Sequence, residues 1–156
     1  MAKLLGVVRL RGTVKIPGPA RETLKRLNLS SRNSFALYYD TPSIRGMMKR
    51  VERFVAWGEL DQEFLSLLLS KRGRTGAGHK LNAEEFKALG FESCDALAKT
   101  IIDGGLPGLR ERGLSNVFHL TPPSKGFEGN LRRPFRNGGV WGDQGKEIHS
   151  LIQKMI

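Results

Sequence analysis

Cysteine is almost absent from this chain of 156 residues, and its scarcity excludes several classes of protein. With Cys94 alone, the chain has no intramolecular disulfide and no cysteine-rich zinc module. The three histidines lie far apart, and none has a metal-ligand partner four residues away. We therefore expect ordinary surface or core histidines. We also expect a buried, inert thiol at Cys94, because no evident base and acid accompany it.

Long apolar runs are also missing. No segment approaches the ~18–20 apolar residues that a membrane-spanning helix needs. The first ten residues are too short and too soon charged, at Lys3 and Arg9, for a secretory signal peptide. The sequence therefore predicts a soluble protein of the reducing cytoplasm, with no membrane partner.

Acidic residues are scarce beside basic ones. The chain has 26 Lys and Arg against 15 Asp and Glu, which gives a net charge of +11. Its hydrophobic fraction of 39% is that of a globular protein with a core. A folded and strongly basic protein indicates a polyanionic partner.

The charge is spread unevenly along the chain. Residues 1–58 carry 12 basic and 3 acidic side chains, and residues 121–156 carry 6 and 3. Residues 59–120 carry 8 basic and 9 acidic side chains, so the middle is close to neutral. We expect the surfaces that bind a polyanion on the first and last parts.

Residues 1–58 alternate between two hydrophobic patterns. Segments rich in Val, Leu and aromatics are typical of strands, and apolar residues at helical spacing are typical of amphipathic helices. Thr41 and Pro42 mark one helix start, because Thr caps helices and Pro suits the first helical position. The pattern predicts a small open sheet with helices covering one face. The expected elements are a strand at 4–10, a helix at 20–29, a strand at 34–39, a helix from Pro42 and a strand from 54–57.

Residues 59–156 are expected to extend that core. The first part, 59–115, shows helical patterns. Residues 121–145 contain six Gly and three Pro, too many for regular structure, so we expect a basic loop. The apolar spacing at 146–156 predicts a C-terminal helix. Shorter signals are helix starts at Asn82 and Ser93 and a strand at 117–120.

One motif comes near a phosphate-binding P-loop. Residues 73–80 read GRTGAGHK, but His79 stands where the motif needs a lysine, and Leu81 where it needs a hydroxyl. The segment also follows a helix rather than a strand, so a flexible basic loop is the better interpretation. No nucleophile elbow occurs either, and the sequence does not favour an enzyme.

Two cationic features favour a nucleic acid as the polyanion. Arg45, Lys49 and Arg53 recur every four residues, which places them on one helix face; a solvated face is the plainer alternative. Residues 121–141 interleave cations with aromatic rings. These rings either stack on exposed bases or pin the loop to the protein's own core, and both interpretations stay open. The rings are Phe127, Phe135 and Trp141.

Four motifs carry a resemblance to a known family: VVRLRG at 7–12, ETLKRLNL at 22–29, YDTPSIRGM at 39–47 and FVAWG at 54–58. With this T-P-x-x-x-G-M turn, residues 4–58 resemble the large-subunit ribosomal protein thirty family, called protein seven in eukaryotes. Segments 57–60 and 122–127 resemble the longer archaeal and eukaryotic form. The long basic N-terminal arm of the eukaryotic form is absent, which favours the archaeal one.

The resemblance implies an α+β, ferredoxin-like core in the order strand–helix–strand–helix–strand, with a three-stranded antiparallel sheet and two helices on one face. It implies a structural constituent of the large ribosomal subunit. Its partners would be large ribosomal RNA, the 5S RNA region and neighbouring large-subunit proteins. It implies no enzymatic activity, no cofactor and no small-molecule substrate.

The expected contacts with RNA are Arg and Lys side chains, because cations neutralise phosphates. The family motifs support Arg9, Lys25 and Arg45, and the other residues rest on charge alone. The set is Arg9, Arg11, Lys15, Arg21, Lys25, Arg26, Arg32, Arg45, Lys49 and Arg53 in the core, and Lys125, Arg132, Arg133 and Arg136 in the basic loop.

Two other functions compete with the ribosomal one. A free-standing ferredoxin-like regulatory domain would bind a small anion or a partner protein in a shaped pocket. The excess of nine positive charges on residues 1–58 argues against it. A non-ribosomal RNA chaperone would share the charge and differ only in having no fixed place in a particle.

Overall fold

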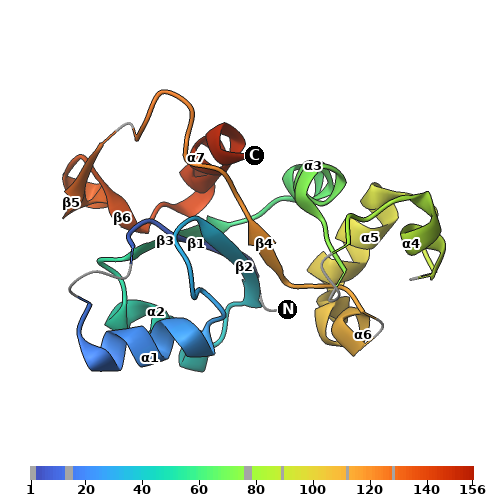
Figure 1. Cartoon of the computed structure of the whole chain (residues 1–156), viewed down its shortest axis with the longest axis horizontal. Helices are drawn as coiled ribbons and strands as arrows, with labels where there is room; N and C mark the ends of the chain where they lie inside the picture. Colours follow the sequence, from blue (N-terminus) through green and yellow to red (C-terminus); the bar gives the residue numbers. More distant parts are fainter. Residues whose placement is uncertain (1–2, 13–15, 76–78, 89, 112, 128) are drawn as a thin grey trace.

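A mixed sheet lies between two layers of helices, with a helical lobe at its side (Figure 1). The computed structural model describes residues 3–12, 16–75, 79–88, 90–111, 113–127 and 129–156. The core elements are β1 (Leu4–Arg9), α1 (Gly18–Arg26), β2 (Ser34–Tyr39), α2 (Pro42–Arg50) and β3 (Val55–Glu59).

The elements beyond the core are mostly helical up to residue 111, and two further strands follow residue 129. They are α3 (Gln62–Arg72), α4 (Ala83–Ala88), α5 (Cys94–Thr100), a π-helical turn η1 (Ile101–Gly105), α6 (Leu106–Glu111), β4 (Val117–His119), β5 (Asn130–Pro134), a 3-10 turn η2 (Phe135–Asn137), β6 (Gly139–Asp143), a 3-10 turn η3 (Gly145–Glu147) and α7 (Ile148–Met155).

The predicted core is confirmed, and the sheet is wider than predicted. Strand order within the described residues is β4-β2-β1-β3-β6-β5. The antiparallel trio β2-β1-β3 is the expected three-stranded sheet. Strand β4 widens this sheet by pairing antiparallel to β2. On the other side, β6 pairs parallel to β3, and β5 pairs parallel to β6. Strands from beyond residue 58 join this sheet, so residues 1–58 and 59–156 contribute to one common sheet. The boundary between two domains at residue 58 stays a prediction.

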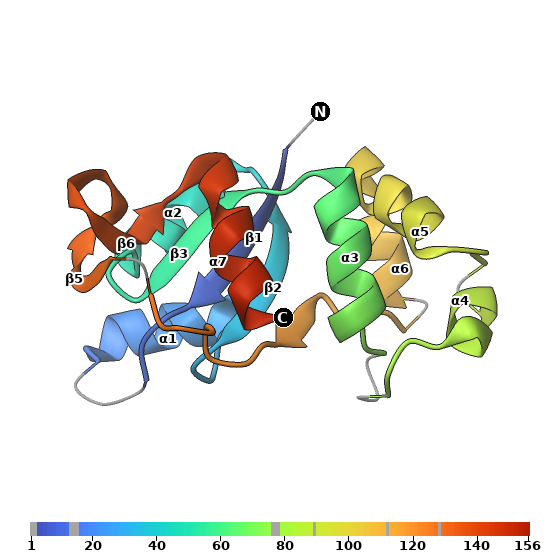
Figure 2. The same ribbon diagram turned by 90° about the horizontal axis from the view of Figure 1, so that it is seen from above.

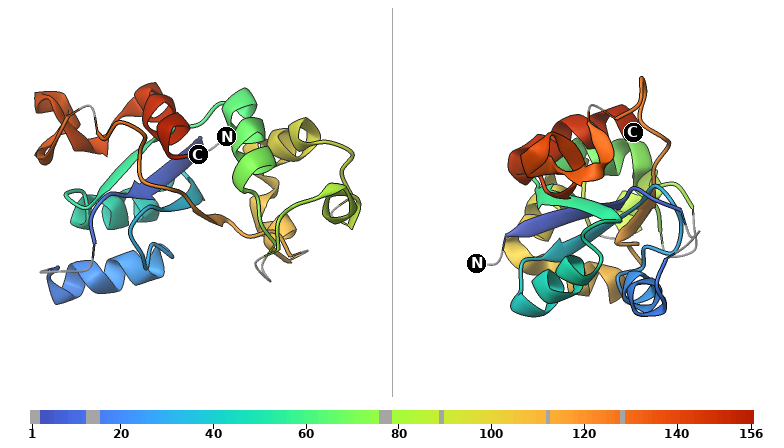
Figure 3. Two further views of the ribbon diagram at one scale, coloured as in Figure 1. Left: turned by 45° about the horizontal axis from the view of Figure 1, so that its top comes forward. Right: turned by 90° about the vertical axis from the view of Figure 1, so that its left-hand side faces the viewer.

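Both faces of the sheet are covered. Helices α1 and α2 lie on one face, and α7 lies on the other (Figure 3). Along β1 the side chains alternate between the two cores: Leu5 and Val7 pack toward α1 and α2, whereas Leu4 and Val8 pack on the opposite side. This double burial explains why residues 4–8 of β1 form a continuous segment without a polar side chain rather than an alternating one.

Local capping signals were correct. The hydroxyl Oγ1 of Thr41 accepts a hydrogen bond from the Ile44 amide at 3.3 Å, which starts α2. Asn82 Oδ1 accepts from the Glu85 amide at 3.0 Å, and Ser93 Oγ accepts from the Ala96 amide at 3.4 Å. Each cap satisfies a backbone donor that has no partner inside its helix.

The prediction of an irregular loop over 121–145 was wrong for the second half of that segment, where β5 and β6 form. The glycines permit the two backbones to approach closely. A Cβ on Gly139 would lie only 1.7 Å from the carbonyl oxygen of Arg133. Glycine enrichment here therefore marks close backbone contact rather than the absence of regular structure.

Two helix ends differ from the expectation. Helix α1 ends at Arg26 instead of residue 29, because Asn28 adopts a left-handed conformation with φ +58°. Helix α2 ends at Arg50, so Arg53 lies in the turn before β3 and not on the helix. The predicted helical face of Arg45, Lys49 and Arg53 is therefore wrong at its third member.

The helical lobe, α3 to α6, lies beside the sheet (Figure 2). Apolar side chains of α3 and α5 pack into the core on the α7 side of the sheet, and two specific contacts add to this packing. Phe64 of α3 stacks on His149 of α7 with ring centroids 4.4 Å apart, and the Tyr39 hydroxyl donates to the Ile101 carbonyl oxygen. Among the described residues, no helix is both long and apolar enough to cross a bilayer.

Candidate nucleic-acid interface

Helix α1 presents three exposed cations, Arg21, Lys25 and Arg26. Its buried residues, Ala20 and Leu24 among them, face the sheet, so the charged residues are left on the outer surface. Arg26 is partly engaged, because its Nη2 lies 3.0 Å from Glu22 Oε1 one helical turn away. Such an exposed pair is weak and leaves the cation available to a phosphate.

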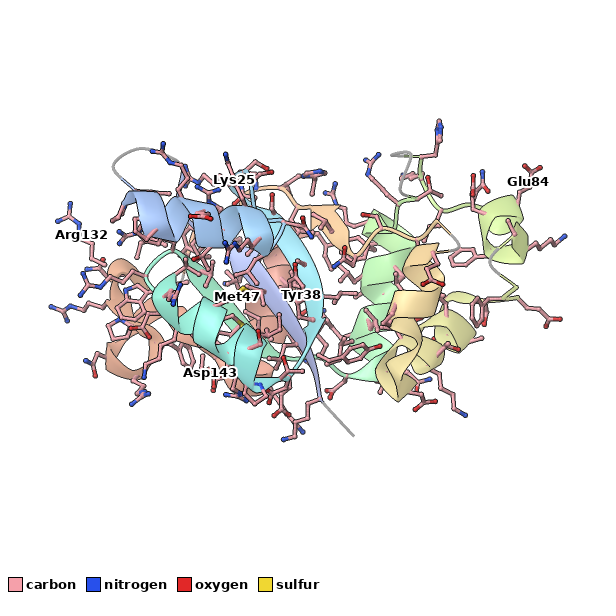
Figure 4. The ribbon with its side chains drawn as sticks, turned by 90° about the horizontal axis from the view of Figure 1, so that it is seen from below. Lys25, Tyr38, Met47, Glu84, Arg132 and Asp143 are labelled. Carbon is pink, nitrogen blue, oxygen red and sulfur yellow. The ribbon has the colours of Figure 1, made fainter. Side chains whose placement is uncertain are left out.

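Lys25 and Arg132 lie in the half of the molecule away from the helical lobe (Figure 4). Lys25 projects from α1, and Arg132 projects from the region of β5 in the same half. Glu84 of α4 lies at the far side of the helical lobe. The first and last parts of the chain, which carry the excess positive charge, thus lie in the same half of the molecule.

Arg45 is held by its own neighbour. Its Nε and Nη2 contact the two carboxylate oxygens of Asp40 at 2.5 and 2.6 Å. This bidentate hydrogen bonding lowers the pKa of Asp40 and raises the pKa of Arg45. Arg45 is therefore a weaker candidate for phosphate than Lys49, which is exposed and has no ion pair with a described residue.

Arg9 is inside the protein. It is 2% exposed, and its Nη1 donates to the Leu29 carbonyl oxygen at 2.7 Å while Nε donates to the Arg11 carbonyl oxygen at 2.9 Å. Burial lowers the pKa of its guanidinium. We assign Arg9 a structural role, since its buried side chain stabilises the turn after β1 and the turn after α1.

Arg11 connects the core to the tail. Its Nη2 donates to the Leu131 carbonyl oxygen at 2.7 Å across 120 positions of sequence. The side chain is half-buried, so part of it faces solvent. Arg11 thus fixes the position of β5 in addition to carrying charge.

The remaining expected cations lie on the surface, apart from one outside the described residues. Arg32 is exposed in the turn before β2, and Arg53 in the turn before β3. Lys15 lies outside the described residues. The tail cations are all exposed: Lys125 in the loop before β5, Arg132 and Arg133 on β5, and Arg136 in η2.

Sequence reasoning missed several cations. Arg50, in the last turn of α2, and Lys146, in η3, are both exposed. A larger group is hidden in the near-neutral middle, where four cations line a hollow of about 550 Å³ at the end of α3. Net charge concealed this group because acidic residues elsewhere in the lobe balance it. The four are Lys71, Arg72, Arg74 and Lys80.

The near-P-loop segment belongs to this hollow. Gly73 follows the end of α3, and Arg74 pairs with Lys80 in an isolated antiparallel bridge. The Thr75 amide donates to the His79 carbonyl oxygen at 2.8 Å, which closes the loop on itself. Residues 76–78 lie outside the described part. The segment follows a helix, as predicted, and lacks the strand that precedes a P-loop.

The sequence left open whether the three aromatic rings of the tail stack on RNA bases or pin the tail to the protein, and the rings pack in two different ways. Phe127 and Trp141 are half-buried and pack against the core on the α7 side, so they pin the tail to the protein. Phe135 is half-buried and packs against neither core. It lines a separate hollow beside α7.

Metal ligands and the single cysteine are the remaining candidate groups. In the part of the chain that the structure describes, no three His, Cys, Asp or Glu residues gather as metal ligands do. Cys94 is half-buried rather than fully buried, and desolvation raises the pKa of its thiol. A raised pKa keeps the thiol protonated near neutral pH, as expected of an inert cysteine.

Comparisons with known proteins agree with this geometry. The family model described as ribosomal protein L30p/L7e matches residues 5–55. A large ribosomal subunit protein uL30 of Nanoarchaeum equitans is 37% identical, with 98% of this chain and 99% of the relative aligned. The uL30 protein of Sulfurisphaera tokodaii is 37% identical over the whole of both chains, and that of Saccharolobus islandicus is 34% identical over the same extent.

Proposed function

Since the chain belongs to the ribosomal protein L30p/L7e family, we propose that it is a structural, RNA-binding constituent of the large ribosomal subunit. The similarity to archaeal uL30 proteins extends over the whole chain, so it includes the tail and the helical lobe as well as the core. The family is one of structural proteins without enzymatic activity. The particle in which it acts is cytoplasmic.

One structural observation carries this proposal: α1, α2 and the tail, which carry exposed cations, all lie in the half of the molecule away from α4 (Figure 4). Cations that neutralise phosphates release counterions, and affinity then falls steeply with salt. Double-stranded RNA is recognised mainly by shape and backbone, which suits a preformed rigid surface.

The proposed contact set differs from the sequence-based one. It excludes Arg9, which is buried, and ranks Arg45 low because of its pair with Asp40. Exposed residues that the sequence reasoning missed, Arg50 and Lys146, join it. The remaining members are Arg11, Lys15, Arg21, Lys25, Arg26, Arg32, Lys49, Arg53, Lys125, Arg132, Arg133 and Arg136.

The first experiment is sedimentation of an extract from the source organism on a sucrose gradient after a moderate-salt wash. We expect about one copy of the protein for each large subunit in the large-subunit peak. A protein found only in the light fractions, with ribosomes intact, would overturn the proposal and favour a free-standing domain that binds a small anion or a partner protein.

Contact with the 5S RNA region is the finer part of the proposal, and it rests on the resemblance to the longer forms of the family. Ultraviolet cross-linking of the purified large subunit, followed by sequencing of the attached RNA, tests it. We expect cross-links in large ribosomal RNA and in or next to 5S RNA. Cross-links confined to distant parts of the large RNA would remove the 5S contact and leave the subunit assignment intact.

A further inference from the structure

The tail of the chain builds a hollow of about 300 Å³ between η2, the start of β6 and α7. Four glycines contribute backbone to its wall, so that part of the wall has no side chains. Val140 and Leu151 supply apolar surface. The volume lies at the lower end of the ~300–1,000 Å³ range of small-molecule sites, which suits a single planar ring system.

Phe135 supplies one wall of this hollow. It differs from Phe127 and Trp141, which pack on the core, because it belongs to neither core cluster. An aromatic ring that is not needed for the core and lines a hollow offers a stacking surface to a flat ligand. Stacking of a nucleobase on such a ring is the usual way in which single-stranded RNA is held.

The polar wall of the hollow combines hydrogen-bond acceptors, which suit a ligand with donors, with one ammonium group, that of Lys154. Glu147 lines it and forms no ion pair with a described residue. Gln144 is 7% exposed, and its Nε2 donates to the Val140 carbonyl oxygen at 2.6 Å. The Gln144 amide oxygen is then the group of that side chain that can accept from a ligand. Ser150 adds a hydroxyl.

We infer that this hollow binds one extruded guanine base of an RNA strand. The base stacks on Phe135, and the Glu147 carboxylate accepts hydrogen bonds from the N1–H and exocyclic amino groups of its Watson–Crick edge. Arg132, Arg133 and Arg136, on the strand and turn that lead into the hollow, meet the flanking phosphates. This inference rests on the proposed RNA-binding function and adds a base-specific contact to it.

Charge distinguishes RNA from a protein ligand. A basic peptide would suit Glu147, but the exposed arginines of β5 and η2 would repel it. A purely apolar ligand would leave Gln144 and the Glu147 carboxylate without partners on binding. A base attached to a phosphate backbone satisfies the acceptors inside the hollow, and its phosphates suit both Lys154 in the wall and the arginines outside it.

Fluorescence anisotropy with the full chain tests the inference. The probes are labelled oligouridine hexamers with one central guanosine, with inosine in its place, or with uridine only, all at one salt concentration. We expect the guanosine probe to bind about tenfold more tightly than the uridine probe. Inosine, which lacks the exocyclic amino group, should fall between them.

Three variants and one control locate the effect. Phe135→Leu and Glu147→Gln should each abolish most of the guanosine preference, and Ser150→Trp should abolish it by filling the hollow from an exposed position. Glu63→Gln on α3 makes the same change of charge as Glu147→Gln outside the hollow and should leave the preference unchanged. Circular dichroism establishes that each variant is folded.

The outcomes separate this inference from the proposed function. Equal binding of the guanosine and uridine probes, or a preference that survives both Phe135→Leu and Glu147→Gln, would overturn the guanine site while salt-dependent RNA binding stands. Displacement by free guanosine monophosphate at the concentration at which the hexamer binds would assign the site to a free nucleotide instead of RNA. Absence of binding to every hexamer would also overturn the guanine site, and salt-dependent binding of ribosomal RNA, measured in parallel, would show separately whether the RNA-binding function stands.

Discussion

Arg45 shows that a cation on the surface is not necessarily a free one. The sequence placed it among the contacts because a family motif and helical spacing both include it. The structure gives it a bidentate partner only five residues earlier, Asp40. An Arg45→Glu variant would place two carboxylates side by side, so any loss of RNA binding would be confounded with a loss of stability.

The Asp40–Arg45 pair makes stability depend on pH. Because the folded state lowers the pKa of Asp40, the pair stabilises the protein above the ordinary pKa of aspartate. That contribution is lost as the pH falls through the lowered pKa. We expect Asp40→Asn to cost a few tenths to about 1 kcal/mol at neutral pH, as for other pairs near the surface. In acid the variant and the parent should become equally stable.

Urea unfolding at a series of pH values measures this difference. Asp103→Asn is the matched control, since Asp103 is exposed and forms no ion pair with a described residue. A difference between Asp40→Asn and the parent that stayed constant into acid would contradict a role for the ionised pair.

Arg9 could not be assigned correctly from the sequence. It lies on a strand that is buried on both faces, where alternation no longer separates inside from outside. Its partners are carbonyl oxygens at Leu29 and Arg11, and the first of these contacts depends on how the chain folds back after α1. A motif residue can therefore be present for the fold alone.

At the scale of helices and strands, local signals predicted well and long-range pairing did not. The caps at Thr41, Asn82 and Ser93 are formed within three residues, so the sequence contains all that they require. The β5–β6 pair was missed because its glycines indicate a loop when counted and a close backbone approach only when the partner strand is known.

Helix α1 should contribute to RNA affinity through charge alone. We expect Arg21→Gln with Lys25→Gln to reduce the dependence of log affinity on log salt by about 0.7–0.9 for each phosphate that the variant no longer neutralises. Folding should be unaffected, because both side chains are exposed. Filter binding of ribosomal RNA at several salt concentrations measures the slope.

A double substitution of equal charge in the helical lobe controls for net charge. Lys87→Gln with Lys99→Gln changes two exposed cations on α4 and α5. We expect a smaller change of slope than for the α1 pair. Equal slopes for the two double variants would mean that overall charge, and not the α1 surface, determines binding.

For the whole molecule, charge summed along the chain was an incomplete guide. It drew attention to the first and last parts, which the fold places in one half of the protein (Figure 4). It hid the cations at the end of α3, because folding gathers Lys71, Arg72 and Lys80 in one place while the acids of the lobe lie elsewhere. Only the three-dimensional arrangement separates such a group from a neutral background.

The two-sided core predicts that residues 1–58 do not fold well alone. Their sheet has an apolar face at Val8, Phe35 and Leu37, and that face is covered by side chains of α3, α5 and α7. We expect the fragment 1–58 to bind a hydrophobic dye and to unfold without a cooperative transition, in contrast to the full chain. Cooperative urea unfolding of the fragment with low dye binding would show that α1 and α2 suffice.

The late position of α7 in the sequence has a consequence for synthesis. The helix that covers the second face of the sheet starts at Ile148, whereas β3 is complete at Glu59. About 90 residues separate the two, and at about 5–20 residues per second their translation takes about 5–18 s. Although α3 and α5 are made earlier in that interval, every newly made copy lacks the part of the cover that α7 supplies until the interval ends. Each copy therefore passes through a period in which aggregation, or shelter by a chaperone, competes with completion of its own core.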